Sequence, residues 1–214
     1  MRAIGSLLRG LFTLASLLAL VALVFKTFFV DIVMVPHNGM APTLLRGERV
    51  LVWRGAQADM ADVMVCEHPA KPEASVLGRA IAFAGHTVSS DDLGNLLVDN
   101  DRASLEYEAG ARFYDDTRNK LFHMKHGFID YRRQHRHEFF LEEGTDFALR
   151  TYMVNRGIYL LGDNRADPND DSREFGEVDP AKCRGQIFLR LTPADRGPDA
   201  IPDDVHHSYL DWIP

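Results

Sequence analysis

The chain contains 214 residues, enough for one good-sized domain or two small ones. Its formal net charge of −7 argues against a nucleic-acid-binding protein, because such domains are usually basic. Hydrophobic residues make up 46% of the chain and charged residues 26%, which is ordinary for a globular protein.

An apolar segment near the N-terminus is the first predicted element. Residues 11–25 carry no charge, and after Lys26 the apolar run continues to Val30. These positions give about 20 residues, which is about the length that a helix needs to cross a bilayer. A cleaved secretory signal peptide is the alternative, but bulky β-branched residues follow where a cleavage site would need small ones. We therefore predict that residues 1–30 form a cytoplasmic tip and a retained, single-pass membrane anchor helix.

Positive charges before the apolar segment predict its orientation. Arg2 and Arg9 favour a cytoplasmic N-terminus by the positive-inside tendency. The main domain then lies on the extracytoplasmic side of the cytoplasmic (inner) membrane, and the lipid bilayer is its first expected partner. Cys66 and Cys183 fall in that compartment, where a disulfide is permitted. They are far apart in the chain, so the sequence leaves open whether they pair or remain two separate buried thiols.

Short segments with the character of β-strands, several of them β-branched, follow the anchor, separated by turn-forming glycine and proline residues. They cover residues 30–35, 49–53, 62–66, 79–85, 95–99, 157–162 and 184–191. No long amphipathic helix is predicted between them, so the pattern favours a mainly β, antiparallel domain. This domain is expected to comprise residues 31–100 and 151–192.

Residues 101–150 interrupt this domain with a charged and aromatic stretch. They predict an inserted sub-domain or a long hairpin, with a short helix near residues 113–126, and a candidate surface for a partner. The stretch contains four histidines, His123, His126, His135 and His137. Their spacing suits a transition metal, but the surrounding arginine and lysine residues oppose a cation, so a solvated surface is predicted. The Pro- and Asp-rich residues 193–214 are predicted to form an irregular tail.

Three sequence motifs lie in order along the predicted β domain. The first is VPHNGMAPTLLRGERVLV at residues 35–52, and the second combines DVMVCEHP at 62–69 with GRAIAFAGHTV at 78–88. The third is GDNRADPNDDSREFGEV at residues 162–178. Together they resemble the motifs of type I signal peptidases (peptidase family S26), and GDNR followed by DSR, downstream of an anchor and MxPT, is highly specific. The matching cleft and structural positions are Pro36, Met40, Pro42, Thr43, Arg79, Asp163, Asn164, Arg165, Asp171, Ser172 and Arg173.

The resemblance implies an antiparallel β catalytic domain near the outer membrane surface, which cleaves signal peptides after a small-x-small sequence. The family's chemistry uses a serine hydroxyl as nucleophile and a neutral lysine amine as general base. Serine is a weak nucleophile until a base takes its proton, and lysine becomes such a base only when burial lowers its pKa. A donor must also meet the developing oxyanion.

Each of these roles is vacant in this chain. Gly39 stands at the nucleophile position and Gly78 at the general-base position, and glycine has no side chain that could take part. His37 stands at the position of the oxyanion-hole hydroxyl, and Pro168 or Asn169 replaces the serine that helps to orient the lysine. The resemblance therefore implies a family member that lacks the Ser/Lys dyad.

The retained motif residues are interpreted as parts of the scaffold. Arg79, Asp171 and Arg173 are predicted to form one charge-assisted network that braces the strands around the site. Asp163 and Asn164 are predicted to lie in a turn and to cap its backbone with their side chains. The sequence therefore predicts that the fold is kept while the catalytic dyad is lost.

Three hypotheses for the function compete. The first is a non-catalytic signal peptidase homologue, without a cofactor, that binds signal peptides by strand addition to a sheet edge, or binds a secretion component such as another signal peptidase. The second is an active signal peptidase with relocated residues, for which a Thr43–histidine pair or a metal held by His37, His68 and His86 is conceivable. The third is a structural subunit of an envelope complex.

Overall fold

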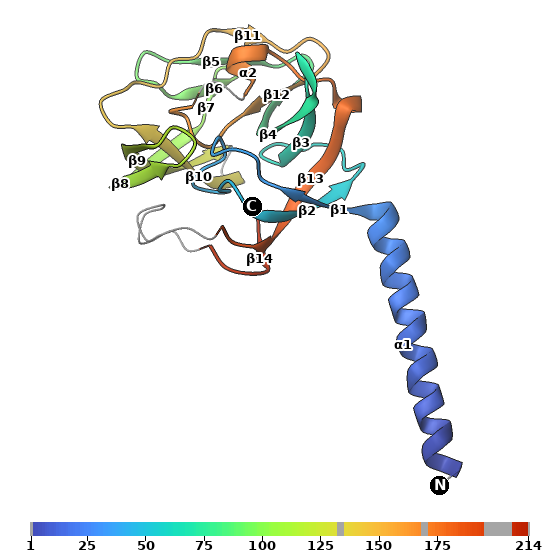
Figure 1. Cartoon of the computed structure of the whole chain (residues 1–214). Helices are drawn as coiled ribbons and strands as arrows, with labels where there is room; N and C mark the ends of the chain where they lie inside the picture. Colours follow the sequence, from blue (N-terminus) through green and yellow to red (C-terminus); the bar gives the residue numbers. More distant parts are fainter. Residues whose placement is uncertain (1, 132–134, 168–170, 195–206, 214) are drawn as a thin grey trace.

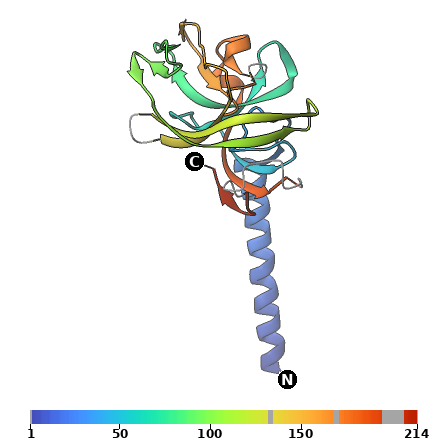
Figure 2. The ribbon, with the colours of Figure 1, turned by 90° about the vertical axis from the view of Figure 1, so that its left-hand side faces the viewer.

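A single N-terminal helix stands apart from the rest of the protein (Figures 1 and 2). The computed structural model describes residues 2–131, 135–167, 171–194 and 207–213. Its first element is α1 (Arg2–Phe29), in which Gly10–Phe29 have a mean hydropathy of 2.2 and lie outside the protein core. This helix is long and apolar enough to cross a membrane.

A seven-stranded antiparallel sheet forms the larger part of the domain that α1 carries. Six strands run in the order β1, β2, β13, β3, β4, β12, and β14 pairs with β13. The bounds are β1 Val30–Met34, β2 Arg49–Arg54, β3 Val63–His68, β4 Lys71–Phe83, β12 Ile158–Leu161, β13 Cys183–Thr192 and β14 Asp211–Trp212. In β2, Val50 and Val52 are buried while Arg49 and Trp53 are exposed, as alternation along a half-buried strand requires. The mainly β, antiparallel fold predicted from the sequence is confirmed.

Two smaller antiparallel sheets complete the domain. One has the strand order β10–β9–β8, and the other has the order β11–β5–β6–β7. The bounds are β5 Thr87–Ser90, β6 Leu96–Val98, β7 Asp101–Arg102, β8 Ser104–Asp115, β9 Lys120–Tyr131, β10 His135–Glu142 and β11 Tyr152–Met153. The prediction of a short helix near residues 113–126 is wrong, because Phe122 and Met124 alternate with exposed neighbours in β9.

Two short helical turns and the last strand lie beside the main sheet. α2 (Ser172–Phe175) and η1 (Pro180–Lys182) precede β13. The prediction of an irregular tail is wrong for residues 211 and 212, which form β14 and pair with β13. Next to them, the Ile213 amide donates to the Phe188 carbonyl at 3.1 Å. β14 lies on the side of the domain from which α1 leaves (Figures 1 and 2).

The sheet formed by β8, β9 and β10, called the inserted sheet below, packs against the loop that joins β1 to β2. One apolar cluster contains residues of both, namely Ala41, Leu45, Ala111, Phe113, Phe122, Met124 and Phe140. At the tip of the β8–β9 hairpin, Asp115 and Asp116 each accept a hydrogen bond of 2.9 Å from the Asn38 side chain. Arg46 adds an ion pair to Asp116 at 2.7 Å. Apolar packing and these polar contacts therefore hold the inserted sheet against the region that contains Gly39.

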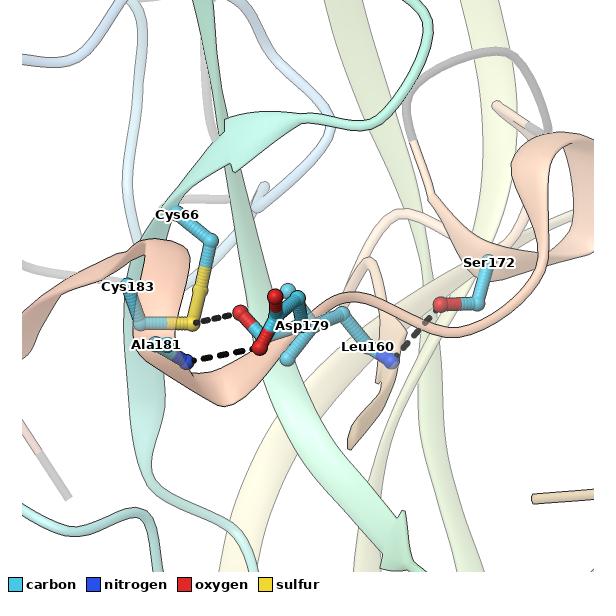
Figure 3. The surroundings of a disulfide bond; sticks show 6 residues. All are labelled: Cys66, Leu160, Ser172, Asp179, Ala181 and Cys183. Atoms are coloured by element: carbon cyan, nitrogen blue, oxygen red, sulfur yellow. Dashed lines mark hydrogen bonds between the residues drawn. A yellow bond between two sulfur atoms is a disulfide. The ribbon is translucent and has the colours of Figure 1, made fainter. Parts of the chain in front are cut away.

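A disulfide joins Cys66 in β3 to Cys183 in β13 (Figure 3). The two residues occupy directly paired positions on neighbouring strands. The structure thereby decides between the two alternatives that the sequence leaves open. The bond spans a sequence separation of 117, and the enclosed stretch contains the inserted sheet and Asp163.

Candidate functional site

The nucleophile position lies in a buried turn between β1 and β2. Gly39 is buried, and its carbonyl accepts a hydrogen bond of 3.0 Å from the Asn164 amide. The Asn164 side chain donates to the Asn38 carbonyl at 3.2 Å. The two bonds need close backbone approach, since a Cβ on Gly162 would lie 2.5 Å from the Gly39 oxygen. His37 braces the same turn, because its Nδ1 accepts from the Gly39 amide at 3.1 Å.

The general-base position has no space for a side chain. Gly78 lies in β4, paired with Met64 of β3, and β12 flanks the other side of β4. A Cβ added to Gly78 would lie 2.8 Å from the Cβ of Leu160 in β12, closer than such atoms approach in proteins. Protein interiors are close-packed, so a lysine here would require β12 to move. The packing of the sheet thus suits a glycine at position 78.

A buried ion pair lies beside these two positions. The Arg79 guanidinium donates two hydrogen bonds to the Asp163 carboxylate, from Nε at 3.0 Å and from Nη2 at 2.7 Å. Both side chains are 0% exposed. The same carboxylate accepts a bond of 2.6 Å from Thr43 Oγ1, and Arg79 Nη1 donates to the Ala61 carbonyl at 2.7 Å. Asp163 thus joins β4, the turn after β1 and the segment after β12.

The DSR motif forms a second, separate network. Asp171 caps α2, accepts a bond of 3.0 Å from the Gly162 amide and pairs with Arg173 at 2.7 Å. Arg173 also donates to the Arg165 carbonyl at 2.7 Å, and Ser172 Oγ accepts from the Leu160 amide at 2.8 Å (Figure 3). The predicted single network is therefore wrong in its grouping, because a different carboxylate holds each arginine.

The sequence predicts that the side chains of Asp163 and Asn164 cap the backbone of their own turn. This prediction is wrong, because both side chains bind residues outside the turn. Asp163 binds Arg79 and Thr43, and the Asn164 amide group bonds to Asn38. Arg165 is buried, with its guanidinium 5.4 Å from the centre of the Phe147 ring. These side chains reach β4, the turn between β1 and β2, and Phe147, and the local sequence of the GDNR turn does not reveal such distant contacts. Pro168 and Asn169 lie outside the described residues.

Thr43 is the candidate for a relocated nucleophile, and a pocket of about 180 Å³ borders Thr43 and His137. Thr43 Oγ1 lies 2.6 Å from one oxygen of Asp163, while His137 Nε2 lies 3.5 Å from the other. In a catalytic triad the imidazole lies between the hydroxyl and the carboxylate. Here the carboxylate lies in the middle, and it is also paired with Arg79. The order of the three groups therefore differs from that of a catalytic triad.

The histidines do not gather into a metal site. Among the residues that the structure describes, no group of three or more His, Cys, Asp or Glu side chains could hold a metal ion. His68 packs on the Phe175 ring at 4.9 Å, whereas His86 lies 3.9 Å from Asp99. The hypothesis of a metal bound by His37, His68 and His86 is therefore wrong.

The predicted solvated surface for the histidines of the insertion is wrong for two of the four. His126 is 3% exposed and His137 is 2% exposed. Burial, followed by the positive charges of Arg79 and Arg165, holds the pKa of His137 well below its usual range. His137, Phe139 and Leu141 are spaced two residues apart, so they lie on the same face of β10. This spacing is the signal that would have placed His137 on the buried face.

A buried cluster under the turn escaped the sequence analysis altogether. Glu48 is 0% exposed and pairs with Arg190 of β13 at 3.1 Å and with His207 at 2.5 Å. Arg190 also pairs with Asp211 at 2.6 Å and donates to the Thr43 carbonyl at 2.5 Å. The cluster ties the C-terminal segment to the turn that carries Gly39. No local sequence pattern marks it, because its members come from three distant segments.

The family model described as signal peptidase, peptidase S26, matches residues 8–192, which include all three motifs and both glycines. The chain belongs to the signal peptidase family. The signal peptidase I of Aquifex aeolicus (strain VF5) is 26% identical over 238 residues, covering 92% of this chain and 93% of that protein. A crystal structure of a signal peptidase I from Enterococcus faecalis V583 is 20% identical, covers 61% of this chain and 97% of the other, and has a TM-score of 0.39.

Gly39 and Gly78 both lie within the range that the family model matches, and not in an unrelated extension. The scaffold of the signal peptidase motifs is retained around them, with Arg79 bound to Asp163 and Arg173 bound to Asp171.

Proposed function

We propose that this chain is a non-catalytic signal peptidase homologue that binds signal peptides without cutting them. The contact between Gly78 and Leu160 carries the proposal, because it leaves no space for the lysine on which the family's chemistry depends. Gly39 removes the nucleophile as well. Losing nucleophile or base costs about 10⁶-fold in turnover in a well-studied serine protease. The proposed protein therefore binds the family's substrate, the signal peptide, but does not catalyse the family's reaction, its cleavage.

The proposed location is the outer face of the cytoplasmic membrane, with α1 crossing the bilayer and the N-terminus inside. Arg2 and Arg9 before the apolar run support this orientation. The Cys66–Cys183 disulfide supports it too, because disulfides persist in oxidising compartments and are rare in the cytosol.

A strand edge next to the anchor suits an extended peptide. β1 follows α1 without a gap and ends the strand order of the main sheet, where it pairs with β2. A peptide that leaves the membrane beside α1 would meet this edge first, and main-chain hydrogen bonds of strand addition would hold it. Binding of this kind needs neither a serine nor a lysine.

The first test uses the full-length chain in detergent micelles with a fluorescent signal peptide. We expect binding by fluorescence anisotropy and no cleavage product by mass spectrometry, while an active signal peptidase I cleaves the same peptide in parallel. Cleavage that disappears on substitution of a residue of this chain would overturn the proposal in favour of relocated chemistry. Absence of both binding and cleavage would overturn it in favour of a structural subunit.

The second test attempts to restore the dyad with Gly39→Ser and Gly78→Lys. Overpacking of a core costs roughly 1–3 kcal/mol, so we expect the double variant to be inactive and less stable in urea titration. Adding Leu160→Ala should recover part of that stability, with Leu160→Ala alone as the matched control. An active double variant as stable as the wild type would show that the position is not filled.

A further inference from the structure

The pocket of about 180 Å³ that borders Thr43 lies between β10 and the C-terminal segment. Its walls include Arg136, His137 and Glu138 of β10 and residues 211–213. Both views of the molecule show the C-terminal end beside the inserted sheet (Figures 1 and 2). Complete small-molecule sites have volumes of about 300–1,000 Å³, so this pocket suits one side chain or a short piece of polypeptide.

An unpaired strand edge of β10 lies beside this pocket. On the side away from β9, the Phe140 amide donates to the Asp163 carbonyl at 2.9 Å, and the Phe140 carbonyl accepts from the Arg165 amide at 2.7 Å. Main-chain groups two residues apart on an antiparallel strand point to the same side, so those of Glu138 point to this side as well. Among the described residues, Glu138 has no main-chain partner there. The edge can therefore receive one more extended segment.

A buried imidazole in the pocket wall lacks a hydrogen bond. His137 is 2% exposed, and neither of its ring nitrogens makes a hydrogen bond within the described part of the chain. Nε2 lies 3.5 Å from the Asp163 carboxylate, and the main chain of His135 lies near the ring. Because burial holds the pKa of His137 well below its usual range, the ring is neutral and has one donor and one acceptor nitrogen. With the proton on Nε2, which faces the carboxylate, Nδ1 is an acceptor without a donor.

Two arginines line the pocket, and carboxylates hold both of them. Arg190 pairs with Glu48 at 3.1 Å and with Asp211 at 2.6 Å. Arg136 pairs with Glu106 at 3.0 Å. Because neither guanidinium is left to attract an anion, the pocket suits a neutral polar occupant better than a phosphate or a free carboxylate.

We infer that the pocket binds an extended segment of another polypeptide that carries a serine or threonine. The segment adds to the edge of β10 and exchanges main-chain hydrogen bonds with Glu138, while its hydroxyl donates to His137 Nδ1. Phe128 and Ile213 line the same pocket and suit apolar neighbours of the hydroxyl residue. This edge is separate from the edge of β1, so the inference does not depend on the proposed binding of signal peptides there.

The test uses the full chain in detergent micelles, labelled with ¹⁵N in its histidines, and the tripeptide acetyl-Val-Ser-Val-amide as the probe. The variant His137→Gln identifies the His137 resonances by their absence. We expect the probe to shift the Nδ1 resonance of His137 in a saturable way. Acetyl-Val-Ala-Val-amide, which lacks the hydroxyl, should bind about fivefold more weakly, because one hydrogen bond is lost.

A matched pair of variants tests the strand edge. Glu138→Pro removes the outward N–H, and an edge strand tolerates proline at such a position. We expect the probe to bind about tenfold more weakly to Glu138→Pro, while Glu138→Ala keeps the N–H and should retain the affinity. A probe with N-methylated amides makes the same test without changing the protein, and it should not bind. Ile32→Pro makes the corresponding change in β1 and should leave binding of the probe unchanged.

Three outcomes would overturn the inference. The first is the absence of a saturable shift at millimolar peptide. The second is equal binding of the N-methylated probe, which would mean that no strand is added. In the third, Ile32→Pro and not Glu138→Pro abolishes binding. That result would assign the peptide to the edge of β1 and would leave the proposed function standing.

Discussion

Removal of the Cys66–Cys183 disulfide by the double substitution Cys66→Ala/Cys183→Ala tests how far this bond supports the domain. The bond joins residues with a sequence separation of 117. In the chain-entropy model, closing a loop of that length removes about 5 kcal/mol of conformational freedom from the unfolded state. Small domains have free energies of unfolding of about 5–15 kcal/mol. The disulfide therefore accounts for a third or more of a typical stability.

The assay is urea unfolding of the full chain in detergent micelles, followed by tryptophan fluorescence. With a slope of about 2 kcal/mol per molar urea, a loss of 5 kcal/mol lowers the midpoint by roughly 2.5 M. The reduced wild type serves as the matched control, because it lacks the bond and keeps both sulfur atoms. Reduced wild type and double variant should unfold at similar urea concentrations, both well below the oxidised wild type.

A difference of less than about 1 kcal/mol between oxidised and reduced wild type would refute the reasoning. It would mean that the unfolded chain gains little freedom when the bond opens. A double variant much less stable than the reduced wild type would instead assign the effect to the packing of Cys66, which is 0% exposed.

Two further predictions concern buried charges. Arg79→Leu leaves the Asp163 carboxylate buried without its main partner, so we expect a loss of about 3–5 kcal/mol in the free energy of unfolding. Arg79→Leu/Asp163→Leu should recover at least half of that loss in urea titration, and no recovery would contradict the pairing. For Glu48, burial raises the pKa, but the hydrogen bond to His207 and the charges of His207 and Arg190 outweigh burial and lower it below 4.5. A depressed pKa stabilises the fold above pH 4.5, and this contribution is lost as the pH falls through the folded-state pKa. Glu48→Gln should lower Tm at pH 7 and flatten the fall of Tm below pH 5, and an unchanged slope would exclude Glu48 as the responsible group.

The sequence predicted the strands that carry strong local patterns. The segment 49–53 becomes β2, where Val50 and Val52 are β-branched, and 184–191 becomes most of β13, where a short apolar run follows Gly185. The sequence did not predict β5 and β11, which have four and two residues and are too short for a periodic signal. In the insertion, aromatic and charged residues hid the alternation of β9.

The sequence predicted which residues belong to the candidate site, but it did not predict which of them contact one another. The motif comparison identified Gly39, Gly78, Arg79 and Asp163 as positions of the site. It did not reveal that Asp163 binds Arg79, because the two residues are 84 positions apart and only the pairing of β4 with β12 brings them together. His137 was assigned to a solvated surface, although its strand turns it inward.

The sequence by itself determined that positions 39 and 78 carry no side chain, because the identity of a glycine is a property of the covalent chain. It also determined the apolar length of the anchor, since bilayer thickness sets that length without reference to a fold. Only the tertiary structure decided that Leu160 occupies the space beside Gly78 and that Cys66 pairs with Cys183. Both depend on which strands become neighbours, and that neighbourhood results from the packing of the whole domain.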